Sequence, residues 1–315
     1  MSAQDRKIVI VGAGSVGAST AYTLVNSGLV DELVLVDINR ERAEGEVSDL
    51  NHGQVFVPPV KIRSGGYDEC RDAAIIIVTA GAAQKPGETR LDLTRRNAGI
   101  IKGIVEEMNR YLGDQVIIMV TNPVDILTMV AHRVCSLPPH HIIGSGTALD
   151  SARFSFFLAR HCGVDTRDVR AYVIGEHGDS EVPLWSRVNI AGISFDDYCH
   201  ICNRDGSDEL KEEISRKVRE SAYHVIESKG ATNWAVSLSL LKVAGAILRY
   251  ENSILSVSTR CSGFYGLPDI CLSLPVILDR EGVKQVIAGP ISPHEQEQLS
   301  ASGRILRQVY EDLHL

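Results

Sequence analysis

The chain has 315 residues, 44% of them hydrophobic, and a mean hydropathy of +0.01, so it can bury a large core and its length favours two domains over one. The net charge of −8 and the isoelectric point near 5.7 argue against a general nucleic-acid or membrane binder, because both need a basic surface. No apolar run approaches the roughly 18 residues of a membrane span, and the N-terminus lacks a signal-peptide pattern, so we expect a cytoplasmic protein.

The first half of the chain alternates strand-like and helix-like segments. Its apolar runs are rich in Val and Ile and too short for helices, and their continuous hydrophobicity is typical of strands covered on both faces. Strands are predicted at 7–13, 32–38, 60–64, 74–80 and 115–121. Helices are predicted at 15–27, 40–51, 90–112 and 124–135. This order predicts an α/β fold with a parallel, doubly wound sheet.

Three glycines follow the first predicted strand, in the segment KIVIVGAGSVG. Gly12 allows a tight turn, Gly14 lets the backbone approach a pyrophosphate, and Gly17 lets the next helix pack on the strand. The anion would lie at the positive end of that helix. The pattern alone could be an ordinary glycine-rich turn, but its place between strand and helix indicates a Rossmann-type dinucleotide-binding domain.

Asp37 ends the second predicted strand, ELVLVDI, twenty residues after Gly17. A carboxylate there can accept hydrogen bonds from both hydroxyls of a ribose. It would also repel the 2′-phosphate of NADP, so the sequence favours NAD as the cofactor. Asp37 could equally be a cap for the helix predicted at 40–51, and the two roles are compatible.

Polar residues follow two further strands, at the sheet edge where ligands bind in open α/β folds. The segment 79–93, TAGAAQKPGETRLDL, follows the fourth strand and contains two glycines and a proline before Arg90. It is predicted to be a mobile lid. Asn122 follows the fifth strand, in the segment TNPVD, and so belongs to the same edge.

The second half, after about residue 145, predicts an α+β domain. Helices are predicted at 151–163, at 208–230 and from 292 onward, with a strand at 169–175 and antiparallel hairpins over 252–290. The seven cysteines are scattered, which suits reduced thiols. Cys199 and Cys202 form a C-x-x-C without the second ligand pair of a zinc site, so we expect no metal.

Three more residues of this half have side chains that could take part in catalysis or bind a charged ligand. Asp150 and Arg153 lie three apart at a helix start in GSGTALDSARF, and His177 lies in a loop in IGEHGDSEVP. Singly, each has an ordinary interpretation, as an exposed loop histidine or a helix-terminal charge. Arg90 could likewise form a surface pair with Glu88. Their combined order and spacing favours a functional site.

Essentially the whole chain resembles the L-lactate and malate dehydrogenase family, and within it the bacterial L-lactate dehydrogenases. The resemblance is carried by GAGSVG, the acid of VDI, AGAAQKPGETRLDL, TNPVDILT, GSGTALDSARF, GEHGDSE and ATNWA. It implies a Rossmann domain that binds NAD at 1–145 and an α+β domain that binds substrate at 146–315. It also implies reversible hydride transfer between NADH and pyruvate, giving L-lactate, in a homotetramer.

The resemblance assigns the chemistry to four residues. His177 matches the acid/base residue, since imidazole can donate and accept a proton near neutral pH, and Asp150 matches its orienting partner. Arg153 matches the residue whose guanidinium fork binds the substrate carboxylate. Arg90 matches the lid arginine that polarises the substrate carbonyl.

The resemblance also implies further contacts with substrate and cofactor. Asn122 would hydrogen-bond the reacting oxygen or His177, and Thr232 would line the pocket beside the substrate side chain. The implied cofactor contacts are Gly12, Gly14, Val16, Gly17, Asp37, Thr79, Ala80, Gly81 and Asn122.

Gln84 separates the two activities of this family. It lies six residues before Arg90, where malate dehydrogenases carry Arg, and a neutral amide cannot neutralise the second carboxylate of oxaloacetate in a closed site. The sequence therefore favours pyruvate. Malate or another 2-hydroxy acid remains the alternative substrate. A protein that binds NAD without catalysis is the alternative of another class, but it would have no reason to keep together His177, Asp150, Arg153 and Arg90.

The chain departs from the family pattern at two positions that concern regulation. Many bacterial L-lactate dehydrogenases bind the activator fructose 1,6-bisphosphate through an Arg and a His, and the corresponding positions here are Ser155 and Arg170. Since phosphate affinity comes mainly from charge-assisted contacts, we expect little or no activation.

Overall fold

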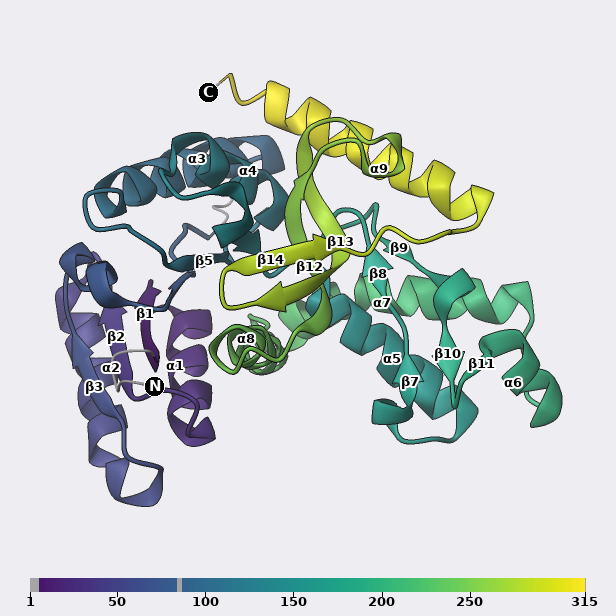
Figure 1. Cartoon of the computed structure of the whole chain (residues 1–315), viewed down its shortest axis with the longest axis horizontal. Coiled ribbons are helices and arrows are strands. Elements are labelled where there is room, and N and C mark those ends of the chain that lie inside the picture. The colour runs from purple at the N-terminus through teal and green to yellow at the C-terminus, as the bar shows by residue number, and fades with distance from the viewer. Residues whose placement is uncertain (1–5, 84–86, 315) are drawn as a thin grey trace.

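One sheet runs through the molecule and positions the candidate site. The structure, a computed structural model, describes residues 6–83 and 87–314. In this part of the chain, six parallel strands follow the order β3-β2-β1-β4-β5-β6, which reverses between β1 and β4 (Figure 1). Their bounds are β1 Lys7–Val11, β2 Glu32–Val36, β3 Lys61–Ser64, β4 Ile75–Val78, β5 Val116–Met119 and β6 Ile142–Gly144. In such sheets, ligands bind beyond the carboxyl ends of the strands at the point of reversal.

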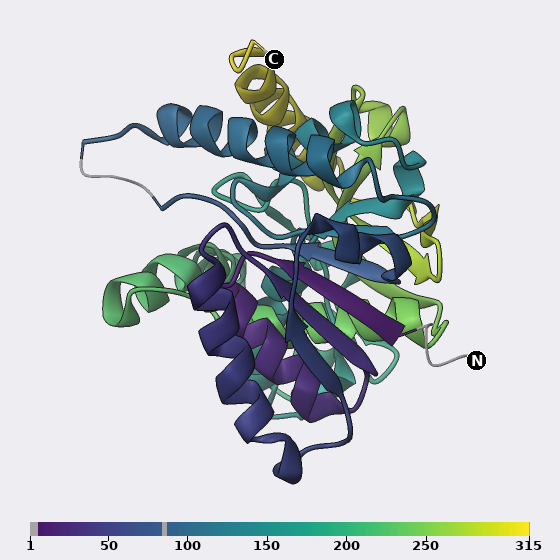
Figure 2. The same cartoon turned by 90° about the vertical axis from the view of Figure 1, so that its left-hand side faces the viewer.

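Helices cover both faces of these strands, which explains their continuous hydrophobicity. Ile8 and Ile10 of β1 belong to the core on one face, whereas Val9 and Val11 belong to the core on the other. The covering helices are α1 Ser15–Ser27, α2 Arg40–His52 and α8 Trp234–Leu248 on the first face, and α3 Arg90–Met108 and α4 Val124–Val134 on the second (Figure 2).

Three antiparallel strands of the second half extend the same sheet. Ser258 of β12 pairs with Gly144 of β6, so the two halves of the chain share one sheet. The added strands are β12 Ser253–Cys261, β13 Ile270–Asp279 and β14 Gly282–Val286.

The rest of the second half packs around a core of its own, to which Phe154, Leu158, Phe195 and Val218 contribute. Its helices are α5 Ala148–Cys162, α6 Phe195–Ile201 and α7 Asp208–Lys229, whereas α9 Pro293–Glu311 contributes Leu299 and Leu306 to the core on the sheet face of α3 and α4. Its short strands are β7 Val169–Arg170, β8 Val173–Ile174, β9 Val182–Pro183, β10 Asn189–Ile190 and β11 Ile193–Ser194.

The predicted fold class is confirmed, with a few local differences. The strand predicted at 169–175 is two strands, β7 and β8, because β7 pairs with β10 and β8 with β9. The helix predicted from 151 begins at Ala148, and the short strand β6 and helix α8 were not predicted. None of the helices in the described residues has the length and apolar character of a membrane span.

Candidate active site

The glycine turn after β1 has the geometry that a bound pyrophosphate requires. Gly12 has a φ of +110°, and a Cβ there would lie 2.6 Å from the backbone N of Ala80. A Cβ on Gly17 would lie 1.8 Å from the carbonyl oxygen of Gly12, so α1 packs against the turn. A Cβ on Gly14 would meet nothing within 4 Å, and no side chain caps α1 at this residue. The start of α1 therefore offers open backbone N–H groups to an anion.

Asp37, which follows β2, holds the glycine turn in place through hydrogen bonds. Its Oδ2 accepts a hydrogen bond from the N–H of Ala13 at 2.6 Å, and its Oδ1 accepts one from the N–H of Asn39 at 2.8 Å. The cap of α2 is Asn39, whose side chain accepts from the N–H of Arg42, so Asp37 is not the N-cap of that helix. Its half-buried carboxylate lies beside the turn, where the ribose of a dinucleotide would fit.

The chain after β4 completes this edge of the sheet. Thr79 Oγ1 donates to the carbonyl oxygen of Gly12 at 2.9 Å, and the N–H of Ala80 donates to Val11 at 2.9 Å. A Cβ on Gly81 would lie 2.3 Å from the side chain of Thr121, so only glycine fits this approach.

Two more of the expected cofactor contacts lie at the same edge. Val16 is half-buried in the first turn of α1. Asn122 follows β5, is exposed, and accepts a hydrogen bond from Asn97 Nδ2 at its carbonyl oxygen, at 3.1 Å.

His177, Asp150 and Arg153 form one hydrogen-bonded cluster. Asp150 lies in the first turn of α5, with its side chain 3% exposed. Its Oδ2 is 2.5 Å from His177 Nδ1, and its Oδ1 accepts from Arg153 Nη1 at 2.6 Å. The helix places Asp150 and Arg153 on one face, as their spacing predicted, and the loop after β8 brings His177 to them.

The cluster favours the protonated form of the imidazole. Burial alone would lower the pKa of His177, but the charge of Asp150 and the hydrogen bond to it raise this pKa to about 9. Burial alone would raise the pKa of Asp150, but His177 and Arg153 hold it below its ordinary value. His177 is therefore an imidazolium at neutral pH and able to donate a proton.

Asp125 links this cluster to the cofactor edge, a connection that the sequence did not reveal. It lies in α4, three residues after Asn122, and accepts a hydrogen bond from the backbone N–H of His177 at 2.7 Å. Burial raises the pKa of Asp125 to about 6. The loop that carries the imidazole is thus tied to the carboxyl end of β5.

Arg90 lies outside the cluster. It is the first residue of α3, after the N-cap Thr89, and its side chain is 73% exposed. Its Nη1 donates to Asp179 Oδ2 at 3.0 Å and its Nη2 to the Tyr223 hydroxyl at 2.6 Å. Within the described residues, no hydrogen bond joins it to the imidazole cluster.

Among the hydrogen bonds and ion pairs of residues 6–83 and 87–314, none joins Arg90 to Glu88, the pairing considered from the sequence. Glu88 accepts a hydrogen bond from Arg96 at 2.7 Å. Thr232 is half-buried between α7 and α8. Gln84 lies outside the described residues.

Comparisons with known proteins identify the family. The model of the lactate/malate dehydrogenase NAD-binding domain matches residues 6–144, and that of the family's alpha/beta C-terminal domain matches residues 147–314. The chain belongs to the lactate/malate dehydrogenase family. The family model assigns NAD binding to the half of the chain that carries the glycine turn and Asp37.

Relatives within the lactate/malate dehydrogenase family agree over nearly their whole length. The chain is 48% identical over 308 residues to an L-lactate dehydrogenase of Acetivibrio thermocellus, covering 98% of this chain and 97% of that protein. It is 46% identical over 307 residues to an L-lactate dehydrogenase of Thermoanaerobacter pseudethanolicus, covering 98% and 99%. The crystal structure of the minor L-lactate dehydrogenase of Enterococcus mundtii matches with a TM-score of 0.95 at 40% identity, covering 98% of each chain. The predicted family and enzyme class are confirmed.

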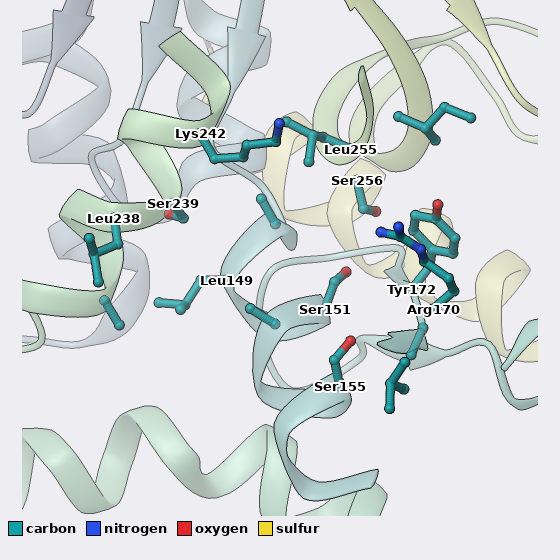
Figure 3. Close-up of a pocket in the computed structure, with 16 residues that line it drawn as sticks. Leu149, Ser151, Ser155, Arg170, Tyr172, Leu238, Ser239, Lys242, Leu255 and Ser256 are labelled. Carbon is teal, nitrogen blue, oxygen red and sulfur yellow. The ribbon is translucent and has the colours of Figure 1, made fainter. Parts of the chain in front are cut away.

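A cavity of about 440 Å³ has a lining that includes none of the residues of the imidazole cluster. Figure 3 shows Ser151 and Ser155 of α5 on one side, and Leu238 and Lys242 of α8 on another. Arg170 of β7 also lines it. Among the described residues, no cluster of His, Cys, Asp or Glu is arranged to hold a metal ion.

Proposed function

We propose that this chain reduces pyruvate to L-lactate with NADH, reversibly, as the names of its relatives indicate. The observation that carries the proposal is the cluster in which Asp150 binds both His177 and Arg153. It combines a proton donor with a cation for a carboxylate, which are the two groups that a 2-oxo acid needs from the protein during reduction.

Each residue of the cluster has a defined task in this proposal. Arg153 binds the substrate carboxylate with guanidinium N–H groups other than the Nη1 donor that Asp150 uses. His177 donates its proton to the carbonyl oxygen, and Asp150 holds the ring by Nδ1 so that Nε2 is the donating atom. NADH, when bound, supplies the hydride to the carbonyl carbon.

The remaining residues would orient and polarise the substrate. Asn122 lies at the sheet edge and would hydrogen-bond the reacting oxygen, and Thr232 would line the side of the pocket that receives the substrate methyl group. Arg90 would leave Asp179 and Tyr223 to stabilise the negative charge that develops on the carbonyl oxygen.

Identification of the product tests this proposal. The purified chain is incubated with NADH and pyruvate, and the product is separated by chiral chromatography. We expect L-lactate, formed in proportion to the NADH consumed. Formation of D-lactate, or no consumption of NADH, would reject the proposal and favour the alternative of NAD binding without catalysis.

We propose that Asp37 makes the enzyme selective for NADH. Because its carboxylate would repel a 2′-phosphate, Asp37→Ser is expected to raise the efficiency with NADPH relative to NADH by about tenfold or more, which corresponds to at least 1.4 kcal/mol. The affinity for NADPH relative to that for NADH, measured by fluorescence titration, should rise as well. Asp49→Ser, an exposed position on α2, is the matched control. Equal efficiency of the wild type with the two cofactors would exclude this role.

We propose that the enzyme needs no fructose 1,6-bisphosphate. Ser155 and Arg170 both line the cavity of Figure 3, and Lys242, also in its lining, is already paired with Glu251 at 2.6 Å. One fewer cation per subunit weakens a site that must hold two phosphates. Initial rates at limiting pyruvate, with and without millimolar effector, should be nearly equal. A large fall in the KM for pyruvate on addition of the effector would contradict this.

We propose that the chain assembles as a homotetramer, as the family resemblance implies. Large apolar side chains exposed on the single chain, such as Phe56 at 85% and Trp234 at 62%, are suited to subunit contacts. Light scattering of the purified protein gives the mass of the assembly and tests this directly.

A further inference from the structure

Glu181 is a buried carboxyl group next to the imidazole cluster, and the reaction as described above does not use it. It lies four residues after His177, directly before β9, and its backbone N–H donates to the carbonyl oxygen of Gly178 at 3.2 Å. The residue is only 7% exposed. Its Oε1 is buried and has no hydrogen-bond partner in the part of the chain that the structure describes.

The cations around Glu181 are engaged with other carboxylates. The charged side chains that act on it electrostatically are Asp150 and Arg153 from α5, His177 from the loop after β8 and Arg219 from α7. Arg153 and His177 both bond to Asp150, at 2.6 Å and 2.5 Å. Arg219 bonds to a glutamate of its own helix at 2.8 Å. Glu181 thus has charged neighbours but, among the residues that the structure describes, no ion-pair partner of its own.

A buried carboxylate without a partner is unstable, so the group keeps its proton. Burial, and then the negative charge of Asp150, raise the pKa of Glu181 to about 8. The side chain is therefore neutral at neutral pH. Two further acids lie near the imidazole: Asp125, which accepts from the backbone N–H of His177, and Glu176, which precedes His177 and accepts from the Ser180 hydroxyl.

We propose that Glu181 is a positioning residue that must hold a proton for the substrate carboxylate to bind at Arg153. This inference rests on the proposed function. With Glu181 neutral, the charges of Arg153 and the imidazolium of His177 are balanced by the carboxylates of Asp150 and Asp125. When Glu181 ionises, the cluster gains a net negative charge, and the new anion repels the substrate carboxylate.

The pH dependence of pyruvate reduction separates this role from a structural one. We expect the KM of the wild type for pyruvate to rise by about tenfold or more as Glu181 ionises, from pH about 8 upward. In Glu181→Gln this rise in KM should be absent. In the conservative variant Glu181→Asp, which keeps a carboxyl group, the rise should remain. These comparisons use the shape of the profile, so a partial loss of active protein does not affect them.

Two results would overturn the inference: a wild-type KM that does not rise above pH about 8, or the same rise in Glu181→Gln. Failure of the proposed function is distinguishable, because it would appear as no NADH consumption at neutral pH. In that case infrared spectroscopy still decides the state of Glu181. A protonated-carboxyl band at neutral pH that is lost in Glu181→Gln supports the inference, and its absence from the wild type contradicts it.

Discussion

Replacing His177 by alanine is expected to lower kcat for pyruvate reduction by about 10²- to 10⁴-fold, the usual contribution of a positioned general acid. NADH affinity should change little, because the glycine turn and Asp37 belong to other segments of the chain. Stopped-flow rates give the first quantity and NADH fluorescence the second. His294→Ala, at an exposed position in α9, is the matched control.

The pH profile of the wild type tests the role of His177 as proton donor without a mutation. Asp150 raises the pKa of His177 to about 9, and only the imidazolium can donate a proton. Pyruvate reduction should therefore fail as pH rises through about 9, whereas lactate oxidation, which needs the neutral ring, should fail as pH falls below it. A His177→Ala variant that keeps most of its turnover would remove the residue from the mechanism.

Gln84→Arg is expected to move the activity from pyruvate to oxaloacetate. A guanidinium would pair with the second carboxylate of oxaloacetate, which the amide cannot neutralise, and sites built around a polar partner discriminate by about 10⁴ or more. The ratio of kcat/KM for the two substrates should therefore change by orders of magnitude. Gln285→Arg, at an exposed position of the edge strand β14, adds the same charge elsewhere and should leave the ratio unchanged. A folded Gln84→Arg protein with the wild-type ratio would show that another residue selects the substrate.

The parts of the fold that could be predicted are those with a strong local pattern. The strands of the parallel sheet are buried on both faces and therefore read as continuous apolar runs, and Ser292 with Glu295 forms the predicted capping box of α9. Helix α8 was missed because it is apolar around most of its circumference and lacks a clear polar face. Strand β6 has only three residues, too few for any periodic signal.

The same distinction applies to the site. Asp150 and Arg153 could be paired from their spacing, because three residues along a helix place them on one face. Asp125 and Glu181 were not recognised, because their burial depends on how α4, α5 and α7 pack around the loop of His177. The partners of Arg90 are distant in sequence, and no local pattern indicates them.

The central claim is that this site reduces a monocarboxylic 2-oxo acid with NADH. The most direct measurement is the kcat/KM of the purified wild type for pyruvate and for oxaloacetate at neutral pH, followed by the absorbance of NADH. The account predicts that NADH is oxidised with pyruvate, and that kcat/KM for pyruvate exceeds kcat/KM for oxaloacetate by orders of magnitude. An efficiency with oxaloacetate that equals or exceeds that with pyruvate would contradict it.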